Sequence, residues 1–148
     1  MRLQSAIFML EDTLLRDDGT AHEGLDKVLS IFKMESVWMY AVTEKKHAEG
    51  EEALKSAGLL DYFRGVLSPD IALCPHDSGT MFERAMKRLH SEKADTVVFA
   101  GRLSAIENAK EAGFRTVAVF GKADADEWEK MKAAATETLE QYGDYLAG

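Results

Sequence analysis

Three residues with chemically useful side chains follow the first apolar segment of the chain. The segment covers residues 6–10, and Glu11, Asp12 and Thr13 come directly after it. Adjacent carboxylates can exchange protons with a substrate or offer oxygen ligands to a divalent cation. Such side chains in a turn more often accept hydrogen bonds from nearby backbone N–H groups, so both interpretations stay open.

Further candidates follow two later apolar segments. Thr43 and Lys45 come after residues 37–42, and Arg102 comes shortly after residues 96–100. A threonine at this place can hold an anion or cap a helix, and basic side chains at helix N-termini can attract an anion. Isolated basic residues are more often solvated, so these positions are hypotheses for an anion site.

A lone cysteine lies in the sequence Cys74-Pro75-His76-Asp77, which suggests a thiol–imidazole pair. The two side chains stand too close in sequence to meet within one turn, so we expect no nucleophilic thiol at this position. The single cysteine also rules out an internal disulfide and fits a reducing compartment. No Cys/His set has zinc spacing.

Apolar segments alternate with helical patterns along the chain, an order typical of a parallel sheet covered by helices on both faces. We expect five strands, over residues 6–10, 37–42, 66–67, 96–100 and 116–120. We expect helices over residues 22–33, 45–57, 78–90, 103–112 and 124–142. The sequence therefore predicts one three-layer α/β/α Rossmann-like domain over residues 1–148, with its site beyond the carboxyl ends of the strands.

The overall composition narrows the classes of partner. The formal net charge is −8, from 18 Lys and Arg against 26 Asp and Glu, which argues against nucleic acid as a partner. No apolar segment is long enough to cross a bilayer, and the first residues lack the pattern of a signal peptide. We therefore expect a cytoplasmic protein without a membrane partner.

The ordered motifs resemble those of the haloacid dehalogenase (HAD) superfamily of phosphatases and phosphotransferases. Residues 6–15 resemble its opening motif, apolar-Phe-Asp-x-Asp-Gly-Thr-Leu, and residues 40–45 resemble its apolar-Val-Thr-Asn-Lys motif. Its Gly-Leu-x-Asp-Tyr-Phe segment, its Lys-Pro motif and its fourth motif correspond to residues 58–63, 74–75 and 99–113. The resemblance covers about residues 5–121 and implies a HAD-like fold.

The resemblance also implies roles for these positions. In the superfamily one aspartate attacks phosphorus, a second acts as general acid and base, a hydroxyl and a lysine hold the phosphate, and acidic residues bind Mg2+. The positions that depart from this pattern are Met9 at the nucleophile, Glu11 at the second aspartate, Asp12 at a glycine, Cys74 at the lysine, Gly101 at the metal-binding aspartate and Arg102 at a serine. Thr13 and Thr43 match it.

These departures argue against aspartyl-phosphate chemistry, because loss of a nucleophile alone costs on the order of 10⁶ in rate. We expect a catalytically inactive pseudo-phosphatase that binds a phosphorylated small molecule or a protein partner, with no metal and no cofactor. One alternative is a hydrolase that uses Glu11 or Asp12, with Mg2+. The other is a structural module that forms a homo-oligomer through the strand-end face or through the exposed side of the final helix.

The spacing of the motifs predicts that the domain has no cap. The superfamily inserts cap domains between the positions of Met9 and Thr43 or between those of Thr43 and Cys74. Both intervals are filled in this chain by the helices and strands already assigned. We therefore expect an open strand-end face, with Met9 as an apolar residue that closes the end of its strand.

Overall fold

The computed structural model describes residues 3–75 and 78–147, and it contains a parallel sheet of six strands in the order β3-β2-β1-β4-β5-β6. The strands are β1 (Ser5–Met9), β2 (Trp38–Val42), β3 (Val66–Leu67), β4 (Thr96–Ala100), β5 (Arg115–Val119) and β6 (Glu137–Leu139). Strand order reverses between β1 and β4, since the chain proceeds outward from β1 to β3 and then from β4 to β6. The carboxyl ends of these two strands are the place where such sheets bind ligands.

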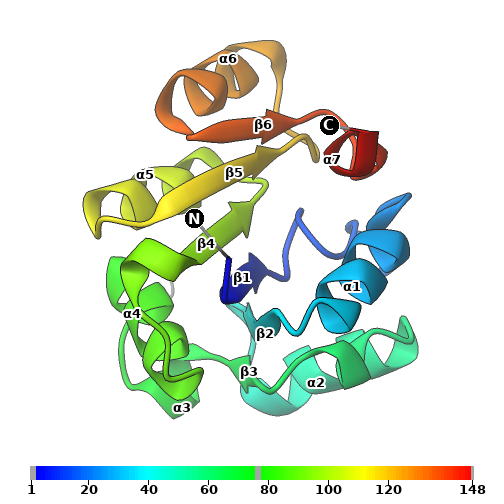
Figure 1. Ribbon diagram of the computed structural model, residues 1–148, viewed down its shortest axis with the longest axis vertical. Helices are drawn as coiled ribbons and strands as arrows, with labels where there is room; N and C mark the ends of the chain where they lie inside the picture. Colours follow the sequence, from blue (N-terminus) through cyan, green and yellow to red (C-terminus); the bar gives the residue numbers. More distant parts are fainter. Residues whose placement is uncertain (1–2, 76–77, 148) are drawn as a thin grey trace.

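Helices cover both faces of the sheet, which gives the expected α/β/α layers (Figure 1). One face carries α1 (Leu25–Met34), α2 (His47–Ser56) and α7 (Gly143–Ala147), and the other carries α4 (Gly79–Arg88), α5 (Leu103–Glu111) and α6 (Ala125–Ala134). Short helical turns occur at η1 (Leu60–Tyr62), α3 (Pro69–Ala72) and η2 (Lys93–Asp95). The Rossmann-like fold class predicted from the sequence is confirmed.

Side chains of β1 alternate between two separate cores. Ala6 and Phe8 pack beneath α1, whereas Ile7 and Met9 pack beneath α4 and α5. All four are buried. This burial on both faces explains why β1 is a continuous apolar run rather than an alternating one.

The prediction of a five-stranded sheet and of a final helix over residues 124–142 is wrong. Helix α6 ends at Ala134, and the chain then adds β6 alongside β5. Thr116 and Thr136 each donate a backbone N–H to the other's hydroxyl, at 3.0 and 3.1 Å, which aligns the two segments. The spacing of Leu139 and Tyr142 imitates a helical stripe, but both residues pack in the core beneath α1, away from Trp128 and Met131 of α6.

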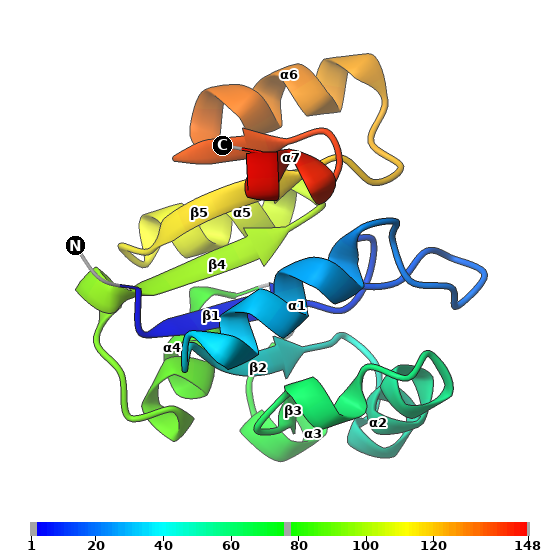
Figure 2. The ribbon, with the colours of Figure 1, turned by 45° about the vertical axis from the view of Figure 1, so that its right-hand side comes forward.

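No additional domain interrupts the first part of the chain. The interval between Met9 and Thr43 contains α1 and β2, and the interval between Thr43 and Cys74 contains α2, η1, β3 and α3. The strand-end face therefore carries no inserted cap (Figure 2). Within residues 3–75 and 78–147, no helix combines the length and apolar character needed to cross a membrane.

Candidate functional site

Three strand ends meet at the point where strand order reverses. Met9 ends β1, Thr43 follows β2, and Gly101 follows β4. Met9 lies beside Val42 in the strand register, and β1 pairs with β4 on its other side. The sheet therefore brings together side chains from the first, second and fourth motifs.

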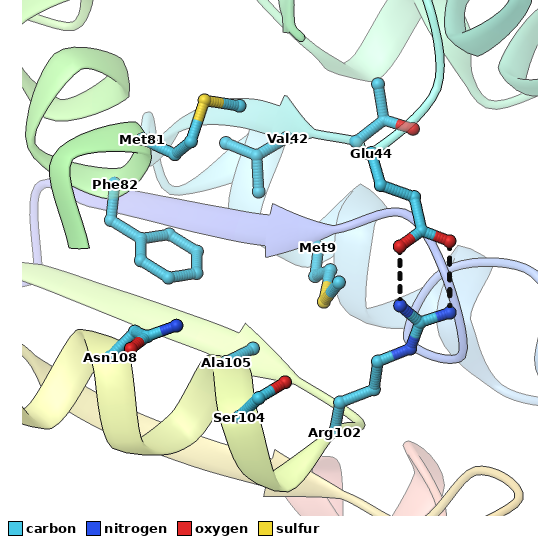
Figure 3. A pocket seen from close by; sticks show the side chains of 10 residues that line it. Met9, Val42, Glu44, Met81, Phe82, Arg102, Ser104, Ala105 and Asn108 are labelled. Carbon is cyan, nitrogen blue, oxygen red and sulfur yellow. Dashed lines mark hydrogen bonds and ion pairs between the residues drawn. The ribbon is translucent and has the colours of Figure 1, made fainter. Parts of the chain in front are cut away.

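The Met9 side chain is directed into a small pocket at this edge of the sheet (Figure 3). The pocket has a volume of about 50 Å³ and is lined by Met9, Val42, Thr43, Glu44, Met81, Phe82, Arg102, Ser104, Ala105 and Asn108. Cavities that hold a benzene molecule are larger, at about 150 Å³. A thioether has no proton to lose and no negative charge, so Met9 offers no phosphate nucleophile to this pocket.

The Thr43 hydroxyl is hydrogen-bonded to the Glu11 carboxylate. Thr43 Oγ1 donates to Glu11 Oε2 at 2.5 Å, and the Glu44 backbone N–H donates to Glu11 Oε1 at 3.0 Å. Burial raises the pKa of Glu11 above its ordinary value, although these two hydrogen bonds act in the opposite direction. Glu11 therefore links the turn after β1 to the segment after β2.

Thr43 does not cap α2, which is the other role considered for it. The N-cap of α2 is Lys46, whose backbone is extended and whose side chain makes no capping bond. Thr43 Oγ1 instead accepts the backbone N–H of Lys45 at 3.1 Å, in a local turn. Its hydroxyl is thus used on both sides, as donor to Glu11 and as acceptor from Lys45.

Asp12 occupies a backbone conformation that favours glycine. Its φ is +58°, in the left-handed region, at the position where the resemblance places a glycine. Its carbonyl oxygen packs against two glycines: a Cβ at Gly101 would lie 2.1 Å from this oxygen, and a Cβ at Gly121 would lie 2.5 Å from it. The turn after β1 therefore fills space that a side chain at position 101 would need.

Thr13 holds the same turn in place through hydrogen bonds of its hydroxyl and its carbonyl. Its hydroxyl accepts the Gly101 backbone N–H at 2.8 Å and donates to the Glu11 carbonyl at 3.0 Å. The Tyr142 hydroxyl donates to the Thr13 carbonyl at 2.8 Å. Thr13 and Gly101 thus hold the backbone of this turn in place. Tyr142 holds the same turn through the Thr13 carbonyl, a role that the sequence did not indicate.

Arg102 binds two carboxylates. Its Nε donates to Asp12 Oδ2 at 2.7 Å, and its Nη1 and Nη2 donate to Glu44 at 2.8 and 3.3 Å. Partial burial lowers the pKa of the guanidinium, but the hydrogen bonds and charges of Glu44 and Asp12 outweigh it and raise the pKa. The Asp12 side chain is only 3% exposed, so this ion pair is largely shielded from water.

The residues present do not fit a bound Mg2+. Such an ion takes carboxylate oxygens in near-octahedral geometry, and Gly101 contributes none. The Asp12 and Glu44 carboxylates are bonded to Arg102, and that of Glu11 is bonded to Thr43. In the described part of the chain, no group of three or more His, Cys, Asp or Glu residues could hold a metal ion.

Two predicted positions lie outside this cluster. Lys45 is exposed and does not line the pocket. Cys74 is half-buried and packs with the core beneath α4 and α5, but it does not line the pocket either. His76 and Asp77 lie outside the described residues.

Several pocket residues are not among the positions to which the motifs assign a role. Met81 and Phe82 come from α4, and Ser104, Ala105 and Asn108 come from α5. In the sequence, Met81 and Phe82 belong to an apolar stripe that indicates only core packing. Glu44 follows Thr43 directly, but its pairing with Arg102 depends on how two distant strands meet.

The comparisons with known proteins agree with this architecture. The family model for haloacid dehalogenase-like hydrolases matches residues 9–119. A probable phosphatase, IndB, of Dickeya dadantii (strain 3937) is 29% identical over 140 residues, which are 94% of this chain and 59% of the length of IndB. The chain thus spans less than two thirds of that relative.

Solved structures show the same fold at low sequence identity. A haloacid dehalogenase-like family hydrolase from Streptococcus pneumoniae superposes with a TM-score of 0.82 at 10% identity, over 98% of this chain and 97% of that one. A beta-phosphoglucomutase from Clostridium difficile superposes with a TM-score of 0.71 at 14% identity, over 86% of this chain and 55% of that one.

Proposed function

Because the chain belongs to the haloacid dehalogenase-like hydrolase family, we propose that it keeps the family's fold but works by binding rather than by phosphoryl transfer. The observation that carries this proposal is the Met9 side chain at the end of β1, directed into the pocket where the resemblance places the nucleophile. A thioether cannot form the aspartyl phosphate on which that reaction depends.

The remaining site residues support the same conclusion. The Thr43 hydroxyl, which in the family would hold a phosphate oxygen, donates its hydrogen bond to Glu11. The Arg102 guanidinium is bonded to Asp12 and Glu44. Neither Glu11 nor Asp12 is available as a nucleophile without breaking these bonds, which weighs against the alternative in which one of them drives hydrolysis.

Of the two ligand classes expected from the sequence, a protein partner suits this face better than a phosphorylated small molecule. The pocket beside Met9 has a volume of only about 50 Å³, so a sugar phosphate would have to lie on the open face outside it. The carboxylates of Glu11, Asp12 and Glu44 outnumber the two nearby cations, Arg102 and Lys122. Both cations are already paired with carboxylates, and this charge balance disfavours a phosphate dianion.

A phosphatase panel with Mg2+ tests the absence of turnover. The wild type is compared with a variant that carries Met9→Asp, Glu11→Asp, Asp12→Gly, Cys74→Lys and Gly101→Asp. Asp12→Gly is included because a side chain at position 101 collides with the Asp12 carbonyl, and glycine gives that turn freedom to withdraw. We expect no turnover by the wild type, and phosphate release by the variant would show that the panel contains a suitable substrate.

Calorimetric titration of the wild type with inorganic phosphate tests the ligand class. We expect no saturable heat. Saturable phosphate binding would show that a phosphorylated ligand is the better choice, and wild-type turnover in the panel would overturn the proposal as a whole.

A further inference from the structure

One arginine joins the segments that follow three different strands. Arg102 follows β4, Asp12 follows β1, and Glu44 follows β2. The two Nη atoms of the guanidinium donate hydrogen bonds to Glu44 (Figure 3). Its Nε donates to Asp12, so each of its nitrogens has a carboxylate partner. The planar fork of arginine suits this double contact better than an ammonium group would.

The Asp12 carboxylate depends on a neighbouring cation. Its side chain is 3% exposed, and a shielded carboxylate without a counter-charge is strongly unfavourable. Arg102 lies 2.7 Å from Oδ2, and Lys122 lies 3.8 Å from Oδ1. Lys122 is 60% exposed and also pairs with Asp17, so Arg102 supplies the closer and better shielded charge.

The backbone around Arg102 also leaves no space for the acidic metal ligand that the family carries after β4. The resemblance places an acidic metal ligand at the position of Gly101, but a Cβ there would lie 2.1 Å from the Asp12 carbonyl oxygen. While the Asp12 carbonyl occupies this place, position 101 therefore cannot carry a carboxylate side chain.

We propose that Arg102 is the resident cation of this site: its guanidinium holds Asp12 and Glu44 together at a strand-end face where the family holds a divalent metal ion. The strand-end face is then assembled by the polypeptide alone, and a metal ion and the guanidinium exclude each other. This inference goes beyond the proposed function, because it concerns how the face is held together whether or not any substrate is turned over.

Thermal unfolding in two salts tests the inference. The wild type, Arg102→Ala, Arg102→Lys and a matched control, Arg84→Ala, are each unfolded in MgCl2 and in NaCl of equal ionic strength. Arg84 is exposed on α4, so its loss reports the general effect of removing an arginine. The readout is Tm, which requires neither turnover nor a known ligand.

We expect the wild type to unfold at the same Tm in both salts. Arg102→Ala should have a lower Tm than Arg84→Ala. Mg2+ should raise the Tm of Arg102→Ala above its value in NaCl, because the Asp12 and Glu44 carboxylates are then released and Mg2+ can bind one or two carboxylates with water as its other ligands. Arg102→Lys should fall between the wild type and Arg102→Ala, since an ammonium group cannot bond both carboxylates in the same way.

Three results would overturn the inference: a higher Tm of the wild type in MgCl2 than in NaCl, equal Tm values for Arg102→Ala and Arg84→Ala, or no response of Arg102→Ala to Mg2+. If Arg102→Ala does not fold, the wild type and Arg102→Lys decide the question in the same two salts. Phosphate turnover by the wild type would refute the proposed function and leave this result unchanged, so the two failures are distinguishable.

Discussion

We expect Gly101→Ala to destabilise the fold by about 2 kcal/mol, because its new methyl group would collide with the backbone of the turn after β1. The Cβ would lie 2.1 Å from the Asp12 carbonyl oxygen, 2.9 Å from the Asp12 carbonyl carbon and 3.3 Å from the Val119 carbonyl oxygen. Real Cβ contacts are essentially never shorter than 3.0 Å, so one of the two backbones must move by about 1 Å.

The magnitude follows from two opposing effects. Overpacking costs about 1–3 kcal/mol, and a collision between backbone atoms belongs at the upper end because no flexible side chain can yield. Alanine also restricts the unfolded chain and so returns about 0.4–1 kcal/mol. The net loss of about 2 kcal/mol should lower Tm by roughly 4–8 °C in a chain of this length.

Urea unfolding followed by circular dichroism measures this loss, with Gly143→Ala as the matched control. Beyond its chain neighbours and its own helix, no atom lies within 4 Å of a Cβ at Gly143, so that variant should stay within about 0.5 kcal/mol of the wild type. Equal stabilities of Gly101→Ala and Gly143→Ala would refute the close packing of the Asp12 carbonyl against Gly101.

Three further results follow from the same contacts. Thr43→Ala should lower the free energy of unfolding by about 1–3 kcal/mol, because it removes a hydrogen bond to the buried Glu11, whereas Thr43→Ser should retain most of it, as urea unfolding can show. Burial raises the pKa of Glu11 above its ordinary value of 4.5, so the folded state favours the protonated acid, and ionisation costs stability as the pH rises from about 4.5 toward the raised value. Glu11→Gln should therefore gain stability relative to the wild type over that rise, and a difference independent of pH would contradict the sign. Tyr142→Phe should cost about 1–2 kcal/mol, since it leaves the buried Thr13 carbonyl without its 2.8 Å donor, and an unchanged urea midpoint would show that another group replaces it.

The alternation of apolar segments and helical stripes was sufficient to predict the first five strands and their order of appearance. Continuous burial makes β1 and β4 easy to identify, and Gly58 and Gly113 follow the ends of α2 and α5 with positive φ, as helix-ending glycines do. The sixth strand was missed because Leu139 and Tyr142 are spaced as on a helix, while the hydrogen bonds that place β6 are made to a distant strand.

The motif positions were assigned from the sequence, but their contacts were not predictable from it. The loss of a carboxylate at Gly101 is visible in the sequence, whereas the use of that space by the Asp12 carbonyl depends on the folded turn. In the same way, Arg102 could be recognised as a charge at a strand end, but its bonds to Asp12 and Glu44 require three segments to meet.

Whether the chain retains any phosphatase chemistry is decided by phosphate release from the purified wild type in the presence of Mg2+, measured beside Glu11→Gln prepared in the same way. We expect both proteins to release phosphate only at the rate of the buffer, because Met9 offers no nucleophile and the nearby carboxylates are bonded within the protein. Release by the wild type that disappears in Glu11→Gln would contradict this expectation and would assign catalysis to the Glu11 carboxylate.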